Sequence, residues 1–139
     1  MKNILKLLWL VPFCLLAIGL ASCGGNTTDE VQTQMNNTYV QISAAEAKAL
    51  MDSEKDYVII DARTQEEYDA GHIPGAVLIP EYEIADRAES KLPDKNQLIL
   101  VYCRSGRRSK IASQALVDLG YTNVKEFGGI IDWEYETVK

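Results

Sequence analysis

Residues 101–109 of the chain read Val101-Tyr102-Cys103-Arg104-Ser105-Gly106-Arg107-Arg108-Ser109. The apolar run that precedes it, residues 97–101, is typical of a buried strand, whereas residues 110–119 have helical spacing that ends at Gly120. This order predicts a turn from a strand to a helix, with Cys103 inside the turn.

Cys103 is predicted to be a stabilised thiolate in this turn. The first amides of a helix have no partners within the helix, and the positive end of its dipole favours an anion. Arg104, Arg107 and Arg108 add positive charge, and Gly106 lets the backbone curl around the sulfur. Such surroundings lower the pKa of a thiol and make it nucleophilic. The alternative is a small core cysteine beside solvated arginines, but three arginines and a glycine within five residues favour function.

The segments around this turn alternate between strand and helix patterns. Ser43 with Glu46 and Thr64 with Glu67 form capping boxes that begin two helices, and the second helix is expected to stop at Gly71. Strands are predicted at residues 39–42, 57–60, 77–79, 97–102 and 123–127, with a weaker helix at 81–90 and a last helical segment opened by residues 128–129. The predicted fold is α/β, with parallel strands, helices on both faces, and Cys103 at a carboxyl end where ligands bind.

The first residues have the pattern of an export signal. Residues 1–22 combine Lys2 and Lys6 with a long apolar region, and Leu20-Ala21-Ser22-Cys23 resembles the lipobox of bacterial lipoproteins. That resemblance implies acylation of Cys23, which would hold the protein on a membrane of the cell envelope, facing the periplasm or the exterior. Residues 23–38 are polar and are predicted to form a lipidated flexible tether, which leaves residues 39–139 as one domain.

Charge and cysteine content exclude several classes of function. The chain has 14 basic and 20 acidic residues; without Lys2 and Lys6 its formal charge is −8, which is unfavourable for binding nucleic acid. Cys14 falls in the signal and Cys23 would be acylated, so Cys103 is the one free thiol expected. Zinc is not expected, because His72 is the single histidine and no second cysteine has ligand spacing. We predict no cofactor.

Four separated motifs together resemble a single rhodanese domain of the sulfurtransferase family. They are Asp61-Ala62-Arg63 after a strand, Gly71-His72-Ile73-Pro74-Gly75-Ala76, the loop Cys103 to Ser109, and Gly128-Gly129-Ile130 with Trp133. The resemblance covers about residues 39 to 138 and implies five mainly parallel strands flanked by helices. It also implies that Cys103 carries sulfur: it would take the outer sulfur of a donor such as thiosulfate as a persulfide and pass it to a thiophilic acceptor.

The same resemblance implies roles for the residues near Cys103. A small anionic donor would be bound by the side chains of Arg104 and Arg107, while Arg108 would pair inward with a carboxylate. A partner protein with a thiol or persulfide is equally compatible with the loop. Asp61 and Arg63 would support the loop, and His72 has a structural position. The backbone amides expected to surround the sulfur are those of Arg104, Ser105, Gly106, Arg107, Arg108 and Ser109.

Three other functions share parts of this pattern. Cysteine-based phosphatases have a Cys-x5-Arg loop, whereas here that spacing reaches Ser109 and the arginine falls one residue earlier, at Arg108. A non-catalytic binding module often loses the cysteine, which this chain keeps. A thiol redox sensor usually has a resolving cysteine nearby, and any such thiol would have to come from a partner.

Overall fold

The computed structural model describes residues 37–139. Strands and helices alternate along this part of the chain, with two short 3₁₀ turns, η1 and η2. In order they are β1 Val40–Gln41, α1 Ala44–Ser53, β2 Tyr57–Asp61, α2 Gln65–Ala70, β3 Val77–Leu78, η1 Glu81–Glu83, α3 Ile84–Lys91, β4 Leu98–Cys103, α4 Arg107–Asp118, β5 Val124–Gly129 and η2 Ile130–Asp132.

Both predicted capping boxes are present. The Ser43 hydroxyl accepts the Glu46 amide at 3.2 Å, and the Glu46 carboxylate accepts the Ser43 amide at 2.8 Å. The Thr64 and Glu67 side chains make the same reciprocal contacts at the start of α2, which ends at Gly71 as predicted. Local hydrogen bonding of this kind satisfies amides that the first helical turn leaves free.

The five strands form one sheet in the order β1-β5-β4-β2-β3, and every neighbouring pair is parallel. β4 is the central strand and all six of its residues are buried, which explains why its sequence is a continuous apolar run. The predicted α/β fold with a parallel five-stranded sheet is therefore confirmed. Cys103, the last residue of β4, lies at the carboxyl edge of the sheet.

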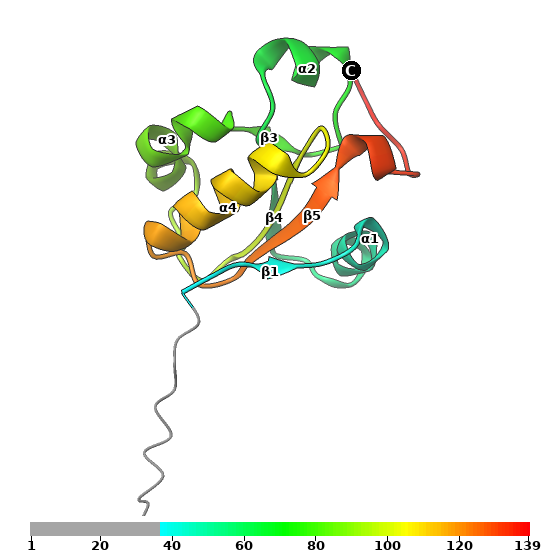
Figure 1. Cartoon of the computed structure of the whole chain (residues 1–139). Coiled ribbons are helices and arrows are strands. Elements are labelled where there is room, and N and C mark those ends of the chain that lie inside the picture. Colours follow the sequence, from blue (N-terminus) through cyan, green and yellow to red (C-terminus); the bar gives the residue numbers. More distant parts are fainter. Residues whose placement is uncertain (1–36) are drawn as a thin grey trace, which may run out of the picture. The chain divides into compact units, whose positions relative to one another are not determined.

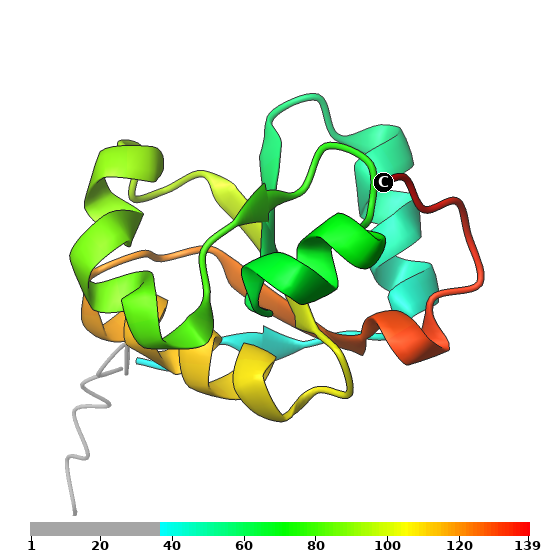
Figure 2. The same cartoon turned by 90° about the horizontal axis from the view of Figure 1, so that it is seen from above.

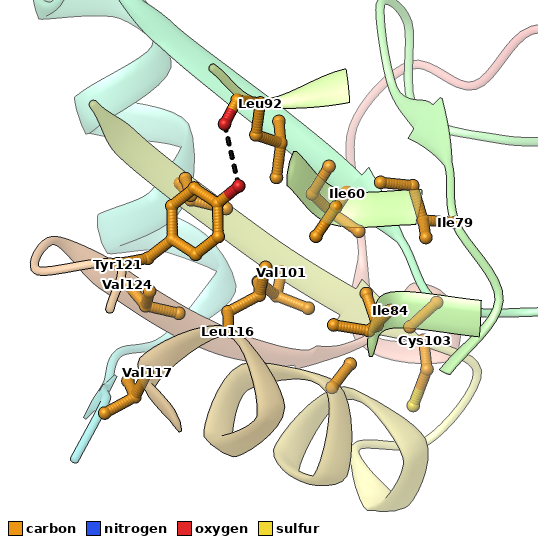
Figure 3. Close-up of a cluster of buried hydrophobic side chains, with 14 residues drawn as sticks. Ile60, Ile79, Ile84, Leu92, Val101, Cys103, Leu116, Val117, Tyr121 and Val124 are labelled. Atoms are coloured by element: carbon orange, nitrogen blue, oxygen red, sulfur yellow. Dashed lines mark hydrogen bonds between the residues drawn. The ribbon is translucent and has the colours of Figure 1, made fainter. Parts of the chain in front are cut away.

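Helices cover both faces of this sheet (Figures 1 and 2). α3 and α4 pack on one face through a cluster that includes Ile84, Val101 and Leu116. Figure 3 shows this cluster, with Cys103 among its members and the Tyr121 hydroxyl donating to the Leu92 carbonyl at 2.7 Å. α1 and residues of α2 and η2 pack on the opposite face. None of the helices in this described part of the chain is long and apolar enough to cross a bilayer.

The structure corrects three predicted boundaries near Cys103. Cys103 ends β4 rather than lying in the turn, and α4 begins at Arg107, three residues before the predicted start. β5 continues through Gly129, so that the final helical segment is only the single 3₁₀ turn at residues 130–132. The connection from β4 to α4 is thus only three residues long. The predicted signal (1–22) and all of the predicted tether (23–38) except its last two residues lie outside the described residues and stay predictions.

Candidate active site

The loop after β4 is closed by a left-handed glycine. Gly106 has φ 97° and ψ −13° and directly precedes α4. Side chains are disfavoured in this conformation, so glycine is suited to a position where the chain must reverse within three residues. The reversal turns the start of α4 back toward the sulfur of Cys103.

Two polar groups, the Gly106 amide and the Ser109 hydroxyl, contact the sulfur of Cys103. The Gly106 amide donates to Cys103 Sγ at 3.0 Å, and the Ser109 hydroxyl oxygen lies 3.4 Å from the same sulfur. Cys103 is 1% exposed, so its sulfur is removed from bulk water. The geometry is that of a small cradle at a helix N-terminus, which suits a negatively charged sulfur.

The balance of these contacts lowers the pKa of Cys103. Burial is the largest single influence and raises this pKa, because it disfavours the charged thiolate. The hydrogen bond between Cys103 and the Ser109 side chain, together with the amides of Ser109, Gly106 and Ser105, acts in the opposite direction and outweighs burial. A thiol with a lowered pKa is a stronger nucleophile near neutral pH.

The three arginines of the loop have different surroundings. Arg104 and Arg107 are exposed and free to meet an anion above the loop. Arg108 is turned toward α2, where its guanidinium donates to both oxygens of Glu67 at 2.6 and 2.7 Å. Arg108 is the principal reason that the pKa of Glu67 falls to about 2. This bidentate pair joins the first turns of α2 and α4 and so fixes the helix that carries the cradle.

Asp61 and Arg63 form a buried network with Tyr102, which directly precedes Cys103 in β4. Their side chains are paired, with Arg63 Nη2 2.7 Å from Asp61 Oδ2, and the Tyr102 hydroxyl donates to the same carboxylate at 2.6 Å. Tyr102 also accepts the Ile73 amide at 3.2 Å, and Arg63 donates to the Gly71 carbonyl at 2.7 Å. Burial, reinforced by Asp61, raises the pKa of Tyr102. The two predicted support residues therefore hold Tyr102 and the 71–73 turn, and reach the loop through Tyr102.

His72 belongs to this turn. Its ring stacks on Tyr68 with the ring centroids 3.6 Å apart, and its Nδ1 lies 2.9 Å from the Tyr68 carbonyl oxygen. Its backbone forms a bridge with Val138 near the end of the chain. These contacts agree with a structural position for His72.

Two residues near the sulfur were not identified from the sequence as part of the site. Glu126 on β5 is 2% exposed and accepts the Ser109 hydroxyl at 2.6 Å, and Gly129 packs directly under the Arg104 carbonyl. Glu126 has no clear sequence signal, because it follows Lys125 in a strand that carries two charged residues, and the only signal for Gly129 is the glycine pair. Among residues 37–139, no three histidine, cysteine or acidic side chains are grouped so that they could hold a metal ion.

The comparisons with known proteins agree with this geometry. The Rhodanese-like domain family matches residues 43–136. Thiosulfate sulfurtransferase PspE of Escherichia coli (strain K12) is 41% identical over 80 residues, which cover 58% of this chain and 77% of PspE. Putative sulfurtransferase YtwF of Bacillus subtilis (strain 168) is 35% identical over 97 residues, which cover 70% of this chain and 92% of YtwF.

A solved structure described as a rhodanese with anions from E. coli is also similar. It is 40% identical, has a TM-score of 0.57, and the match covers 60% of this chain and 98% of that one. Relatives of this kind support sulfur transfer as the general activity. By its motifs, its fold and the family match over most of its length, the chain belongs to the Rhodanese-like domain family.

Proposed function

We propose that this protein moves sulfane sulfur from a small anionic donor, such as thiosulfate, to a thiophilic acceptor through a persulfide on Cys103. The observation that carries the proposal is the cradle itself: the Gly106 amide donates to Cys103 Sγ at 3.0 Å at the start of α4. The similarity to thiosulfate sulfurtransferase PspE supports thiosulfate as the donor.

The reaction has two displacement steps. The Cys103 thiolate attacks the outer sulfur of thiosulfate, a new S–S bond forms, and the old S–S bond breaks with its electron pair leaving on sulfite. A nucleophilic acceptor, cyanide or a thiolate, then attacks the outer sulfur of the persulfide and releases the Cys103 thiolate. Both steps need negative charge on sulfur, which preorganised amides and the α4 dipole stabilise without rearranging.

The exposed arginines are assigned to binding the donor. Arg104 and Arg107 flank the cradle and can neutralise the oxygens of a thiosulfate ion, while the Arg108 side chain is already engaged by Glu67. The engagement of Arg108 also argues against phosphate hydrolysis, in which a loop arginine must bind the phosphate oxygens. The retained cysteine and its hydrogen bonds argue against a module that only binds. The alternative to these small molecules is a partner protein, whose persulfide would be the donor or whose thiol would be the acceptor.

Intact mass spectrometry of the purified domain tests the proposal. After incubation with thiosulfate, the protein should gain one sulfur atom and release one sulfite per chain, and cyanide should remove that sulfur. Cys103→Ser should gain none, while its free energy of unfolding should stay within about 1 kcal/mol of wild type, since the change is a conservative one at a strand end. A Cys103→Ser protein that still transfers sulfur, or a wild type that no donor sulfurates, contradicts the mechanism.

We also propose that the domain is lipid-anchored through Cys23 in the cell envelope. The proposal is supported by the lipobox-like Leu20-Ala21-Ser22-Cys23 and by the polar segment that follows it. Membrane fractionation of cells expressing the full chain tests it: wild type should sediment with membranes, and Cys23→Ala should be released with its turnover unchanged. A wild type found in the soluble fraction contradicts the anchor.

A further inference from the structure

A carboxylate that has no basic partner in the described part of the chain lies next to the cradle. Glu126 is 2% exposed, and its hydrogen-bond partners are all neutral: the Ser109 hydroxyl at 2.6 Å, the Gly128 amide at 2.9 Å and the Gln41 side-chain amide at 3.2 Å. Within residues 37–139, none of the ion pairs includes Glu126. No cation therefore offsets the cost of burying a negative charge on this side chain.

Ser109 lies between this carboxylate and the nucleophile. Its hydroxyl oxygen is 3.4 Å from Cys103 Sγ and 2.6 Å from Glu126 Oε1, and the residue is fully buried. The hydroxyl also lies 3.1 Å from the Gly106 carbonyl and 3.3 Å from the Gly128 carbonyl, but the carboxylate contact is the shortest. Because a hydroxyl has one hydrogen, it donates to Glu126 while the carboxylate is charged, and can then only accept from Cys103.

We propose that Cys103 and Glu126 share a single proton through the Ser109 hydroxyl. In one arrangement the thiol S–H donates to Ser109 Oγ and the Ser109 O–H donates to a charged Glu126. In the other, the thiol proton has moved to Ser109 Oγ and the original Ser109 proton has moved to Glu126 Oε1. The S–H bond and the old O–H bond are broken, new O–H bonds are formed, and no electron or proton leaves the site.

Electrostatics favours one shared proton over none. A thiolate and a charged Glu126 would be two buried anions separated by a single hydroxyl, and like charges this close repel each other. With the proton on Glu126, Ser109 donates toward the thiolate and joins the Gly106 amide in stabilising it. Glu126 is then a positioning and proton-holding residue that acts on sulfur through Ser109, and forms no contact with the donor.

Other charged side chains near Cys103 and Glu126 come from several helices and strands. On α4 and its loop, Arg108 is close enough to Cys103 to interact with it electrostatically, and exposed Arg104, Arg107 and Lys110 surround the cradle. On α2 and η1, Glu67 and Glu81 face Arg108 rather than Glu126. On one side of Glu126, β1 contributes the neutral Gln41. On the other side, the residue of β4 that pairs with Glu126 is the apolar Val101. Glu126 is therefore the anion that competes most directly with the thiolate.

Glu126→Gln tests the shared proton while preserving the shape of the site. Glutamine keeps an oxygen that can accept the Gly128 amide and the Ser109 hydroxyl, and Gln41 can turn its own amide to accept from the new NH₂. Glu134→Gln, at an exposed position on the same chain, removes one charge far from these contacts and is the matched control.

The readout is ultraviolet absorbance of the thiolate as a function of pH. Wild type and Glu134→Gln should titrate in a broad or two-step curve, since two coupled groups share the proton. Glu126→Gln should give one sharp step, with its midpoint ~1–2 pH units below the last step of wild type, as expected for removing a charge this near. If Glu126→Gln titrates as wild type does, the proposal is wrong.

A second measurement needs no substitution in the site. Iodoacetamide alkylates Cys103 and removes its charge, so no second buried anion then opposes a negative charge on Glu126. Infrared spectra are recorded at a pH at which the ultraviolet absorbance shows the thiolate. The band of a protonated carboxylic acid should be present before alkylation, absent after it, and absent in Glu126→Gln. The lack of this band in the unalkylated protein overturns the proposal.

The inference concerns the nucleophile of the proposed function. Both readouts follow the thiol and the carboxyl without sulfur transfer, so the shared proton and the sulfur transfer can each fail while the other holds.

Discussion

Gly129→Ala should displace the cradle while the sheet stays intact. Gly129 is opposite Cys103 in the register of β4 and β5, and its backbone is extended, at φ −128°, which any residue can adopt. A Cβ at this position would lie 2.1 Å from the Arg104 carbonyl oxygen, 2.5 Å from its carbon and 2.6 Å from Ser105 Cα. These are backbone atoms that no rotamer change can move.

The size of the displacement follows from these distances. Ordinary contact begins near 3.4 Å, so the loop must retreat by more than 1 Å. Overpacking of this kind costs about 1–3 kcal/mol of unfolding free energy. Misplacing reacting groups by about 1 Å lowers turnover by roughly 100-fold. The movement also separates the Gly106 amide from Cys103 Sγ, so the pKa of Cys103 should rise.

Sulfur transfer from thiosulfate, the pH dependence of alkylation by iodoacetamide, and chemical denaturation would measure these three effects. Gly120→Ala is the control, because Gly120 has a left-handed φ of 94° with open space around it and lies beyond the far end of the twelve-residue α4. It should lose about 1 kcal/mol of stability through backbone strain and keep its turnover. Wild-type turnover and thiol reactivity in Gly129→Ala would refute the reasoning.

Two further substitutions test the supports of the site. Glu67→Gln removes the charge that pairs with Arg108. Pairing holds the pKa of Glu67 at about 2, below its value of 4.5 without a partner. In wild type the stabilisation from this pair is therefore present above about pH 4.5 and is lost as the pH falls toward 2. Since the pair is partly exposed, Glu67→Gln should lose only about 1–2 kcal/mol at pH 7, and its stability should fall less than that of wild type in acid denaturation between pH 4.5 and 2; parallel curves would contradict this assignment. Tyr102→Phe leaves the Ile73 amide and the Asp61 carboxylate without the hydroxyl and should lose about 1–3 kcal/mol in denaturant unfolding, and a loss below 0.5 kcal/mol would show that the network is not needed.

The sequence predicts this fold well because its signals are local. The apolar run of β4 and the two capping boxes are each contained in a few consecutive residues, and alternation of strands and helices restricts the topology to a parallel sheet. The position of Cys103 at the carboxyl edge follows from the same alternation. The early start of α4 differs from the prediction because the left-handed conformation of Gly106 shortens the loop.

The partners of the cradle could not be predicted in the same way. Arg108 was expected to meet a carboxylate, but Glu67 is 41 residues away and was explained in full by its capping role. Glu126 reaches Ser109 across 17 residues, and which face of β5 it occupies depends on the register with β4. A pattern within one segment does not contain that register, so tertiary contacts of this kind require the structure.

The central place of β4 has a consequence for how the protein is made. β4 pairs with β2 on one side and with β5 on the other, and β5 supplies both Glu126 and Gly129 to the surroundings of the loop. Parallel pairing closes long loops and forms slowly compared with local structure. A nascent chain therefore exposes Cys103 before residues 124–129 have emerged from the ribosome to complete its surroundings. Until then, Ser109 lacks the Glu126 carboxylate and the Arg104 backbone lacks the Gly129 backbone against which it packs, so the surroundings of Cys103 are complete only after β5 has been made.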